Sequence, residues 1–448
     1  MRTHALLGLL SLLILSAATP PAFSQGALLP PGPPAPTMKS LDQIASTGIF
    51  INAANTPGNS ASQFVISQPG SYFLTSNLSA SAGKNGIRIA SSEVTLDLNG
   101  FTMAGASAGQ AAITDGGNNS GNATIRNGSI RGWSGAGIDI SHSFDSRIFD
   151  LIVVNNGGAG MNLGDAPLVR DCLARDNTGN SIVTGPNAAI THCTAVGSAT
   201  GNGFTTGPNC TLANCTANFN HGSGIIVGSG CSLSACAACQ NNSIGIQTGG
   251  DSTVSDCTAS GNLGQYGLVA NPGAVVSHCS VCHNTSNQAI SAGILAGGAT
   301  ITDCIVNNNT STASTLTATT GMGIYVNGTD TVIKGCNASG NKGDGIYVAS
   351  RCQVTGNLCG DNATAGVHAT GTENRINDNQ VDHNGAVGIQ VDATVNLIFH
   401  NVARNNAQNF VIVAGNRTAT IAVPATSSAN GNSGGSAFST DAFSNLGY

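Results

Sequence analysis

The stretch from Gly203 to Asn241, GFTTGPNCTLANCTANFNHGSGIIVGSGCSLSACAACQN, decides the fold because it contains one pattern twice. Each copy begins with a glycine before an apolar residue, carries a cysteine 12 residues later and ends in an asparagine five residues after that cysteine. The second copy starts 21 residues after the first. Self-similarity at such a period is the sequence signature of a solenoid.

The same columns extend over most of the chain. The glycine column comprises Gly137, Gly160, Gly203, Gly224, Gly245, Gly267, Gly293, Gly323, Gly345, Gly366 and Gly388, with Ser181 in the one gap and weaker copies at Gly86 and Ala112. The asparagine column comprises Asn156, Asn177, Asn220, Asn241, Asn262, Asn284, Asn309, Asn341, Asn362, Asn384 and Asn406, with Ser198 as its exception. The cysteine column comprises Cys172, Cys193, Cys215, Cys236, Cys257, Cys279, Cys304 and Cys336.

Each repeat contains three short apolar runs separated by glycine or asparagine, which is typical of one coil of a three-sided parallel β-helix. Equivalent strands of adjacent coils then pair at about 4.8 Å, so that like side chains stack on like. We expect an inward isoleucine ladder, an inward cysteine ladder and a buried asparagine ladder that passes amide hydrogen bonds between coils. The sequence therefore predicts an all-β, single-stranded parallel β-helix of about fourteen coils.

Domain boundaries follow from the ends of the repeat. Residues 1–24 are predicted to be a signal peptide cleaved after about Ser24, since an apolar run too short to span a bilayer follows Arg2 and His4. Residues 25–40 form a proline-rich linker. We expect residues 41–85 to supply the N-terminal cap and entrance strands, 86–409 the β-helix, and 410–448 the C-terminal cap and tail. Within the caps, 41–44 is expected to be a short helix.

Composition excludes several classes of protein. Charged residues make up 8% of the chain and hydrophobic residues 40%, which is unlike a coiled coil or a disordered chain. The net charge is −6 and no basic run occurs, so no nucleic-acid partner is expected. No segment after the signal peptide is long and apolar enough to cross a membrane. We expect a secreted, periplasmic or cell-surface protein.

Two segments carry a resemblance to a known family. The entrance segment Phe64–Gly105 and the run Ala123–Trp133 (ATIRNGSIRGW) resemble right-handed parallel β-helix proteins of the pectate-lyase-like superfamily, in particular exported bacterial members. The resemblance covers about residues 60–448 and implies a right-handed helix. It does not define an activity, because this fold is found in lyases, hydrolases, epimerases, adhesins and sugar binders. The Asp-Asp, GHG and RIK signatures of polygalacturonases are absent.

The 14 cysteines of an exported chain raise the question of disulfides or metal. Cysteines stacked in register point the same way, whereas the Cβ atoms of a disulfide converge to about 3.8 Å. We therefore expect mostly buried thiols, with Cys210 and Cys231 as the likeliest bridge. No cysteine pair is combined with histidine at zinc-like spacing, so no metal site is predicted. No cofactor is expected, although Ca²⁺ remains open.

The residue before each cysteine should lie at a bend and point outward. On three successive coils this position holds Asp256, His278 and Asp303. A carboxylate about 5 Å from an imidazole raises the pKa of the histidine and can share its proton. These three residues are the candidate catalytic groups for acid–base work on a polysaccharide; the alternative is an exposed polar column in which such residues are ordinary turn formers.

A second outward column follows the apolar residue after each repeat glycine. It contains Tyr325, Tyr347 and His368, which should stack along the axis and offer ring faces to sugars. The alternative is a ladder that only stabilises the sheet. Two long repeats add residues at Thr285–Ala292 and Thr310–Thr320, and adjacent insertions commonly form the binding side of a solenoid.

These observations favour an exported scaffold that binds carbohydrate, or a cell-envelope component, without catalysis. The alternative is a polysaccharide lyase or glycoside hydrolase that uses Asp256, His278 and Asp303 on an acidic or neutral glycan. A more distant alternative is a periplasmic metal-handling protein. Oligomeric state, ligand identity and the redox state of the cysteines stay open.

Overall fold

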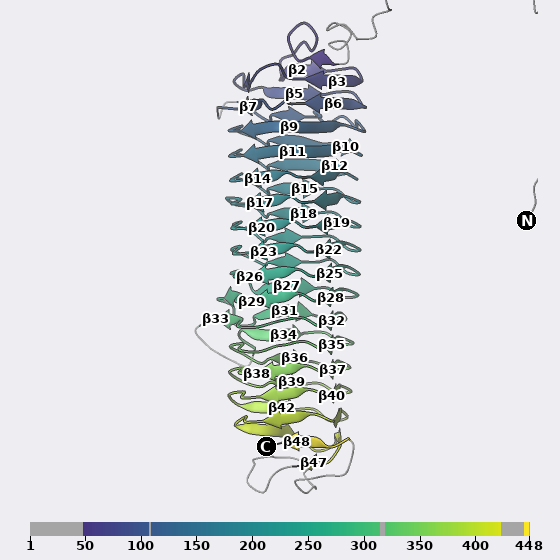
Figure 1. The fold of residues 1–448 in the computed structure, drawn as a ribbon, viewed down its shortest axis with the longest axis vertical. Coiled ribbons are helices and arrows are strands. Elements are labelled where there is room, and N and C mark those ends of the chain that lie inside the picture. The colour runs from purple at the N-terminus through teal and green to yellow at the C-terminus, as the bar shows by residue number, and fades with distance from the viewer. Residues whose placement is uncertain (1–47, 107–108, 314–318, 423–442, 448) are drawn as a thin grey trace, which may run out of the picture. The chain divides into compact units, whose positions relative to one another are not determined.

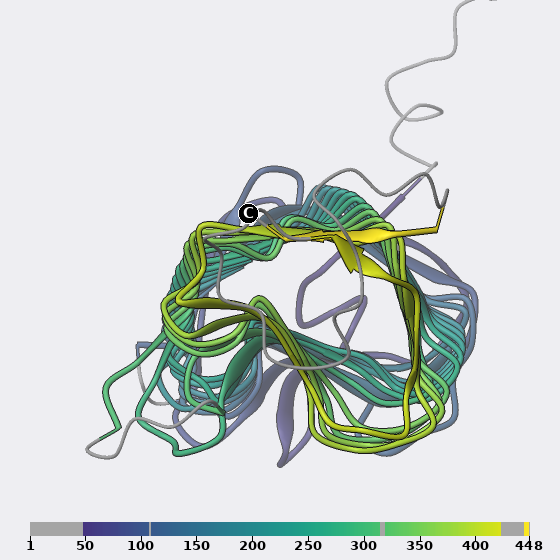
Figure 2. The same ribbon diagram turned by 90° about the horizontal axis from the view of Figure 1, so that it is seen from below.

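The computed structural model describes residues 48–106, 109–313, 319–422 and 443–447 of the chain. Within these ranges the chain winds into a right-handed parallel β-helix of about 17 turns (Figure 1). Seen along the axis, successive coils superpose on one another (Figure 2). The predicted signal peptide, the linker and the helical cap at 41–44 lie outside the described residues. No helix among the described residues is long and apolar enough to cross a membrane.

The first face of the solenoid, here called sheet 1, has one strand from each of 16 coils. Its strands are β2 (Ser62–Ile66), β5 (Asn85–Ile89), β8 (Ile113–Thr114), β10 (Ile138–Phe144), β12 (Met161–Asp165), β15 (Ile182–Thr184), β18 (Phe204–Thr206), β21 (Ile225–Ile226), β24 (Ile246–Gln247), β27 (Tyr266–Ala270), β31 (Ala292–Ala296), β34 (Met322–Val326), β36 (Ile346–Val348), β39 (Val367–Ala369), β42 (Val387–Val391) and β45 (Gln408–Ile412).

A second face stacks in the same way. Its strands are β1 (Ile49–Phe50), β3 (Gly70–Phe73), β6 (Val94–Asp97), β13 (Leu168–Arg170), β16 (Ala189–Thr191), β19 (Thr211–Ala213), β22 (Ser232–Ser234), β25 (Thr253–Ser255), β28 (Val275–Ser277), β32 (Thr300–Thr302), β35 (Val332–Lys334), β37 (Gln353–Thr355), β40 (Arg375–Asn377), β43 (Leu397–Phe399) and β46 (Arg417–Thr418). The long strands β9 (Thr124–Arg131) and β11 (Arg147–Val154) join this face to the third.

The third face completes each coil. Its strands are β4 (Leu78–Ser79), β7 (Thr102–Ala104), β14 (Leu173–Arg175), β17 (Thr194–Val196), β20 (Thr216–Asn218), β23 (Ala237–Cys239), β26 (Thr258–Ser260), β29 (Ser280–Cys282), β38 (Leu358–Gly360), β41 (Gln380–Asp382), β44 (Val402–Arg404), β47 (Ile421–Ala422) and β48 (Asn445–Gly447). The two insertions contribute β30 (Thr285–Ser286) and β33 (Thr310–Ser311), which pair only with each other.

The predicted number of fourteen coils is too low, because the sequence pattern weakens at both ends. Sheet 1 begins with β2, one coil before Gly86, and ends with β45, one coil after Gly388. Phe410, which was expected to belong to a cap, is a fully buried member of β45. In the tail, β48 adds a parallel strand beside β44, so this part extends the third face.

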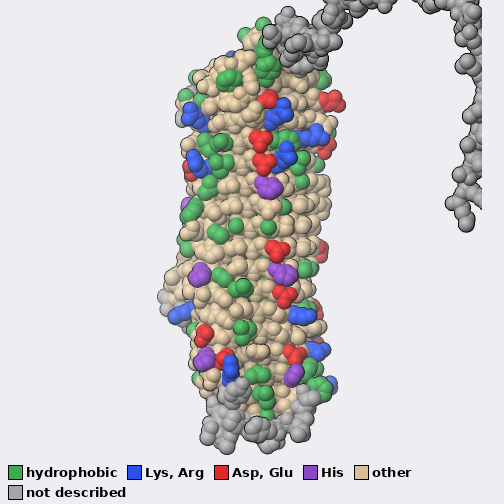
Figure 3. All heavy atoms as spheres, viewed as in Figure 1, with side chains coloured by type: hydrophobic (Ala, Val, Ile, Leu, Met, Phe, Trp, Pro, Cys, Tyr) green, Lys and Arg blue, Asp and Glu red, His purple; other side chains and the backbone are tan. Residues whose placement is uncertain are grey.

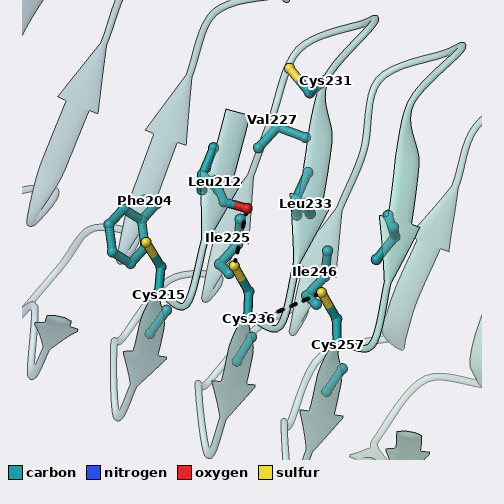
Figure 4. Packing of buried hydrophobic residues seen from close by; sticks show 14 of the residues in the cluster. Phe204, Leu212, Cys215, Ile225, Val227, Cys231, Leu233, Cys236, Ile246 and Cys257 are labelled. Carbon is teal, nitrogen blue, oxygen red and sulfur yellow. Dashed lines mark hydrogen bonds between the residues drawn. The ribbon is translucent and has the colours of Figure 1, made fainter. Parts of the chain in front are cut away.

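The core consists of stacked side chains of one kind, as the repeat predicts. Along sheet 1 the inward residues Ile225, Ile246 and Leu268 lie in register on adjacent coils and are fully buried. The cysteine column points into the same interior, where Cys215, Cys236 and Cys257 pack beside leucine and isoleucine (Figure 4). All 14 cysteines are free thiols. Cys210 and Cys231, the predicted bridge, are neighbours in which the Cys210 amide donates to the Cys231 sulfur at 3.2 Å.

A buried asparagine ladder runs along the coils, as expected. In a typical rung, the amide N–H and the Nδ2 group of Asn241 both donate to Oδ1 of Asn262, at 3.0 Å each. The same Nδ2 group also donates to the Ala217 carbonyl oxygen at 2.9 Å. The ladder therefore satisfies buried backbone groups at a turn where no strand is available to do so.

The glycine column exists because the backbone of the next coil and the asparagine ladder together leave no room for a side chain. A Cβ atom added to Gly203 would lie 2.6 Å from the Gly224 carbonyl oxygen of the next coil and 2.9 Å from Nδ2 of Asn220, both too close for a real contact. This close approach explains why the exception to the glycine column and the exception to the asparagine column fall in one coil. Ser181 replaces the glycine in the coil in which Ser198 replaces the asparagine, so a smaller ladder residue coincides with a larger neighbour.

Candidate functional site

The predicted acid–base residues Asp256, His278 and Asp303 do stack on successive coils. The amide of Asp256 donates to the Ser277 carbonyl oxygen and that of His278 to the Thr302 carbonyl oxygen, at 3.1 Å each. All three side chains are exposed, and among the described residues no hydrogen bond or ion pair joins one to another. The structure thus brings them side by side without linking them.

The backbone explains why this column is polar. The φ angles of Asp256, His278 and Asp303 are 54°, 52° and 53°, within the left-handed region that aspartate, asparagine, histidine and glycine tolerate best. Later coils place Gly335 and Gly356 at the same position, also with positive φ. Turn geometry alone accounts for these residue types, and Figure 3 shows that charged side chains on that face follow one another along the coils.

The predicted aromatic column lies on the outer face of sheet 1. Tyr325 of β34 pairs with Tyr347 of β36, which pairs in turn with His368 of β39. The ring centroids of the two tyrosines are 5.4 Å apart, and those of Tyr347 and His368 are 5.1 Å apart at 75°. The prediction that these rings stack along the axis is confirmed. We call these three residues the strip.

Two aspartates that sequence reasoning missed hold His368 in place. Nδ1 of His368 lies 2.8 Å from Oδ2 of Asp344, and Nε2 lies 2.8 Å from Oδ2 of Asp392. Asp344 is completely buried, while the side chain of Asp392 is 44% exposed. Because carboxylates only accept hydrogen bonds, bonds at both ring nitrogens require the protonated imidazole.

Further bonds fix the two carboxylates. Oδ1 of Asp344 accepts from the Thr364 hydroxyl and from the Ala365 amide, the latter at 2.8 Å. Oδ1 of Asp392 accepts from the Gln390 side-chain amide at 2.9 Å. The network therefore runs from a buried carboxylate, through the imidazole, to a carboxylate that faces solvent.

The electrostatic balance favours the charged form of His368. Burial lowers the pKa of the His368 imidazole, but the hydrogen bonds and charges of Asp344 and Asp392 outweigh it and leave that pKa raised. For Asp392, burial raises the pKa of the carboxyl group, and the bond to His368 outweighs it, so the pKa is lowered. Burial also raises the pKa of the Tyr325 hydroxyl.

A signal for the two aspartates is present in the sequence. Both lie 24 residues from His368, one before it and one after it. The coil steps here are 21 and 22 residues, so each partner is offset from the strip by two or three positions on the neighbouring coil. A comparison of equivalent positions in successive repeats cannot find a contact between residues that are offset in this way.

The strip is bordered by features on both edges of sheet 1. The paired insertion strands β30 and β33 lie at the edge where β31 and β34 begin, as the long repeats predict. The pocket that adjoins the strip lies at the opposite edge, where these strands end. It has a volume of about 480 Å³ and is lined by Ala270, Asn271, Pro272, Leu295, Ala296, Gly297, Gly298, Asn327, Gly328, Thr329 and Asp330.

No metal centre is evident in the part of the chain that the structure describes. Among those residues, no group of three histidine, cysteine, aspartate or glutamate side chains is arranged to hold a metal ion. His368 and its two aspartates do not form such a group, because the carboxylates bind opposite sides of the ring.

Comparison with known families assigns the fold. The family model described as a right-handed β-helix region matches residues 47–207, 202–352 and 311–423, and the chain belongs to this family. No curated protein matches the chain.

Several solved structures are similar to this chain. The A-module of mannuronan C-5 epimerase AlgE6 of Azotobacter vinelandii is 14% identical, with a TM-score of 0.41 over 69% of this chain and 90% of that one. Pectate lyase Pel9A is 15% identical, with a TM-score of 0.37 over 52% and 71%. The Dettilon tailspike protein is 14% identical, with a TM-score of 0.40 over 66% and 60%. These similarities concern the fold alone.

Proposed function

We propose that the protein is an exported β-helix that binds carbohydrate through Tyr325, Tyr347 and His368 and does not cleave it. The observation that carries this proposal is the outward aromatic ladder, in which the half-buried rings of Tyr325 and Tyr347 contact each other and the buried ring of His368, which the Asp344–His368–Asp392 network fixes. Ring faces pack against the C–H faces of sugars, and fixed carboxylates accept hydrogen bonds from sugar hydroxyls. Export rests on the N-terminal sequence.

The fold itself does not require this arrangement. Elsewhere on sheet 1 the same outward column holds Thr205, Ile226 and Gln247, and the strands there stack equally well. A buried charged network is costly unless every group is paired, so its presence on an outward face favours a functional role over a structural one. The alternative of catalysis by Asp256, His278 and Asp303 has no comparable support, because turn geometry explains those residues.

The test is a panel of polysaccharides offered to the mature protein, scored for binding and for release of reducing or unsaturated ends. We expect binding without release, weakened at least about tenfold in Tyr325→Ala and Tyr347→Ala, which corresponds to about 1.4 kcal/mol. Thr205→Ala, at the same column on a distant coil, is the matched control and should bind like the parent. Release of ends that is lost in His278→Ala would show an enzyme and overturn the proposal.

A further inference from the structure

The pocket beside the strip shares a residue with its column. Leu295 of β31 lines the pocket, and it pairs in register with Tyr325, the first residue of the strip. Its side chain is half-buried and occupies the outward position that Tyr325 and Tyr347 occupy on the next two coils. The pocket and the strip therefore form one continuous surface.

The pocket offers the groups that recognise sugar hydroxyls. Asn327 is exposed at its rim, while Asn271 is half-buried and its Nδ2 group donates to the Thr248 carbonyl oxygen at 2.6 Å. The carboxylate of Asp330 is held by Arg351 through bonds of 2.9 and 2.7 Å, so its geometry is fixed. Leu295 adds apolar area. Amides, one fixed carboxylate and an apolar side chain suit a polar, uncharged ligand.

The charges around this surface do not favour a polyanion. Asp330 is neutralised by Arg351, and the strip network contains two carboxylates to one imidazolium. Lys342 is an exposed cation at the turn before Asp344, and it only balances that excess. A glycan with a negative charge on every sugar needs a surplus of cationic side chains at its site, whereas the net charge of the protein is −6.

The spacing of the coils matches a linear chain of sugars. From the end of β27 at the pocket to Asp392 after β42 there are five coil steps, which span roughly 24 Å at the parallel strand spacing. One sugar of an extended pyranose chain advances by a similar distance to one coil. The tyrosines, one on each coil, thus repeat with the period of such a ligand.

From these observations we infer that the pocket and the strip are two ends of one site, which binds a linear, uncharged glycan along the solenoid axis with about one sugar on each coil. This inference rests on the proposed function, since the strip is the centre of the site. It adds to the proposed function the class of the ligand, the direction in which the glycan lies on the solenoid, and the role of the pocket residues in binding one end of that glycan.

The experiment is calorimetric titration with cello-, manno- and xylo-oligosaccharides of two to six sugars, and with oligogalacturonides of the same lengths. We expect the affinity for one neutral series to rise with each added sugar up to about six, because five coil steps join six coils. Binding that is already maximal for a disaccharide, tighter binding of the oligogalacturonides, or no binding of any neutral series would overturn the inference.

Variants at the two ends separate this inference from the proposed function. Leu295→Ala, one coil beyond Tyr325, should weaken binding of the hexasaccharide about tenfold and that of a trisaccharide less than about twofold, since only the longer ligand reaches past the strip to the pocket. Asn242→Ala, which removes an exposed asparagine from a turn on a distant coil, should change neither. If Tyr347→Ala abolishes binding but Leu295→Ala has no effect on the hexasaccharide, the inference is wrong and the strip remains the site. If Tyr347→Ala has no effect, the proposed function itself is wrong.

Discussion

Two outward columns of this solenoid look alike in the sequence and differ in the structure. Asp256, His278 and Asp303 lie at a turn with positive φ, where the backbone itself selects such residues. Tyr347 and His368 lie on sheet 1, where extended backbone accepts almost any side chain. A repeated polar residue therefore indicates function only where the backbone conformation does not itself select that residue type. In this molecule that condition holds for the column of Tyr325, Tyr347 and His368 on sheet 1, here called the sheet column, and not for the turn column of Asp256, His278 and Asp303.

The largest expected effect follows from breaking the network at its centre. His368→Ala would leave the carboxylate of Asp344 buried without its partner, and we expect a loss of about 3–5 kcal/mol in the free energy of unfolding. Chemical denaturation measures this loss, with the double variant Asp344→Asn/His368→Ala as the control that recovers part of it. A loss below about 1 kcal/mol would show that the network is not held as described.

A second prediction concerns the glycine column, where the packing of the core selects the residue type. Gly203→Ser should destabilise the protein by about 1–3 kcal/mol, because the added side chain meets the carbonyl oxygen of Gly224 and the side-chain amide of Asn220. Asn220→Ser loses ladder bonds and should also destabilise the protein. The double variant should nevertheless lose less free energy of unfolding than the two single variants lose in total, since the natural coil with Ser181 and Ser198 combines both changes. Strict additivity in the double-mutant cycle would contradict this explanation of the glycine column.

The charged state of His368 predicts a dependence of stability on pH. Its pKa is raised in the folded protein, so the stabilisation is fully present below the unfolded pKa of about 6.5 and is lost as the pH rises through the folded value. Unfolding curves measured at a series of pH values should show this decline in the parent protein. The decline should be absent in His368→Gln; if it persists there, another group is responsible.

The smallest effect is expected at the turn column. His278→Gly should change the free energy of unfolding by less than about 1 kcal/mol, because glycine adopts positive φ without strain and already occupies this position at Gly335 and Gly356. The comparison variant is His278→Val, a β-branched residue that is strained at the same φ and should be clearly less stable. Equal stabilities of the two variants would remove the backbone explanation for the column.

How far the sequence predicts this molecule depends on how each contact repeats. Register, the inward ladders and the stacking of Tyr325 on Tyr347 are predictable, because a solenoid places each residue above its equivalent one repeat away. The extra coils at the two ends escape prediction because β2 and β45 lack the repeat glycine; at β45 its place is taken by Asn409, which precedes Phe410, the register partner of Ile389.

The candidate site is predictable only in part, for a geometric reason. His368 follows from its column, whereas Asp344 and Asp392 reach it diagonally from the turns that flank sheet 1. The pocket escapes prediction because it depends on how three loops at the ends of β27, β31 and β34 lie beside one another. Loop conformation is not encoded in the repeat pattern.

The central claim is that the sheet column, and not the turn column, is the functional one. The most direct test compares Tyr347→Ala and His278→Ala in one titration with the glycan that the panel identifies. We predict that Tyr347→Ala weakens binding at least about tenfold and that His278→Ala changes it less than about twofold. Unchanged binding in Tyr347→Ala together with a loss in His278→Ala would contradict the account.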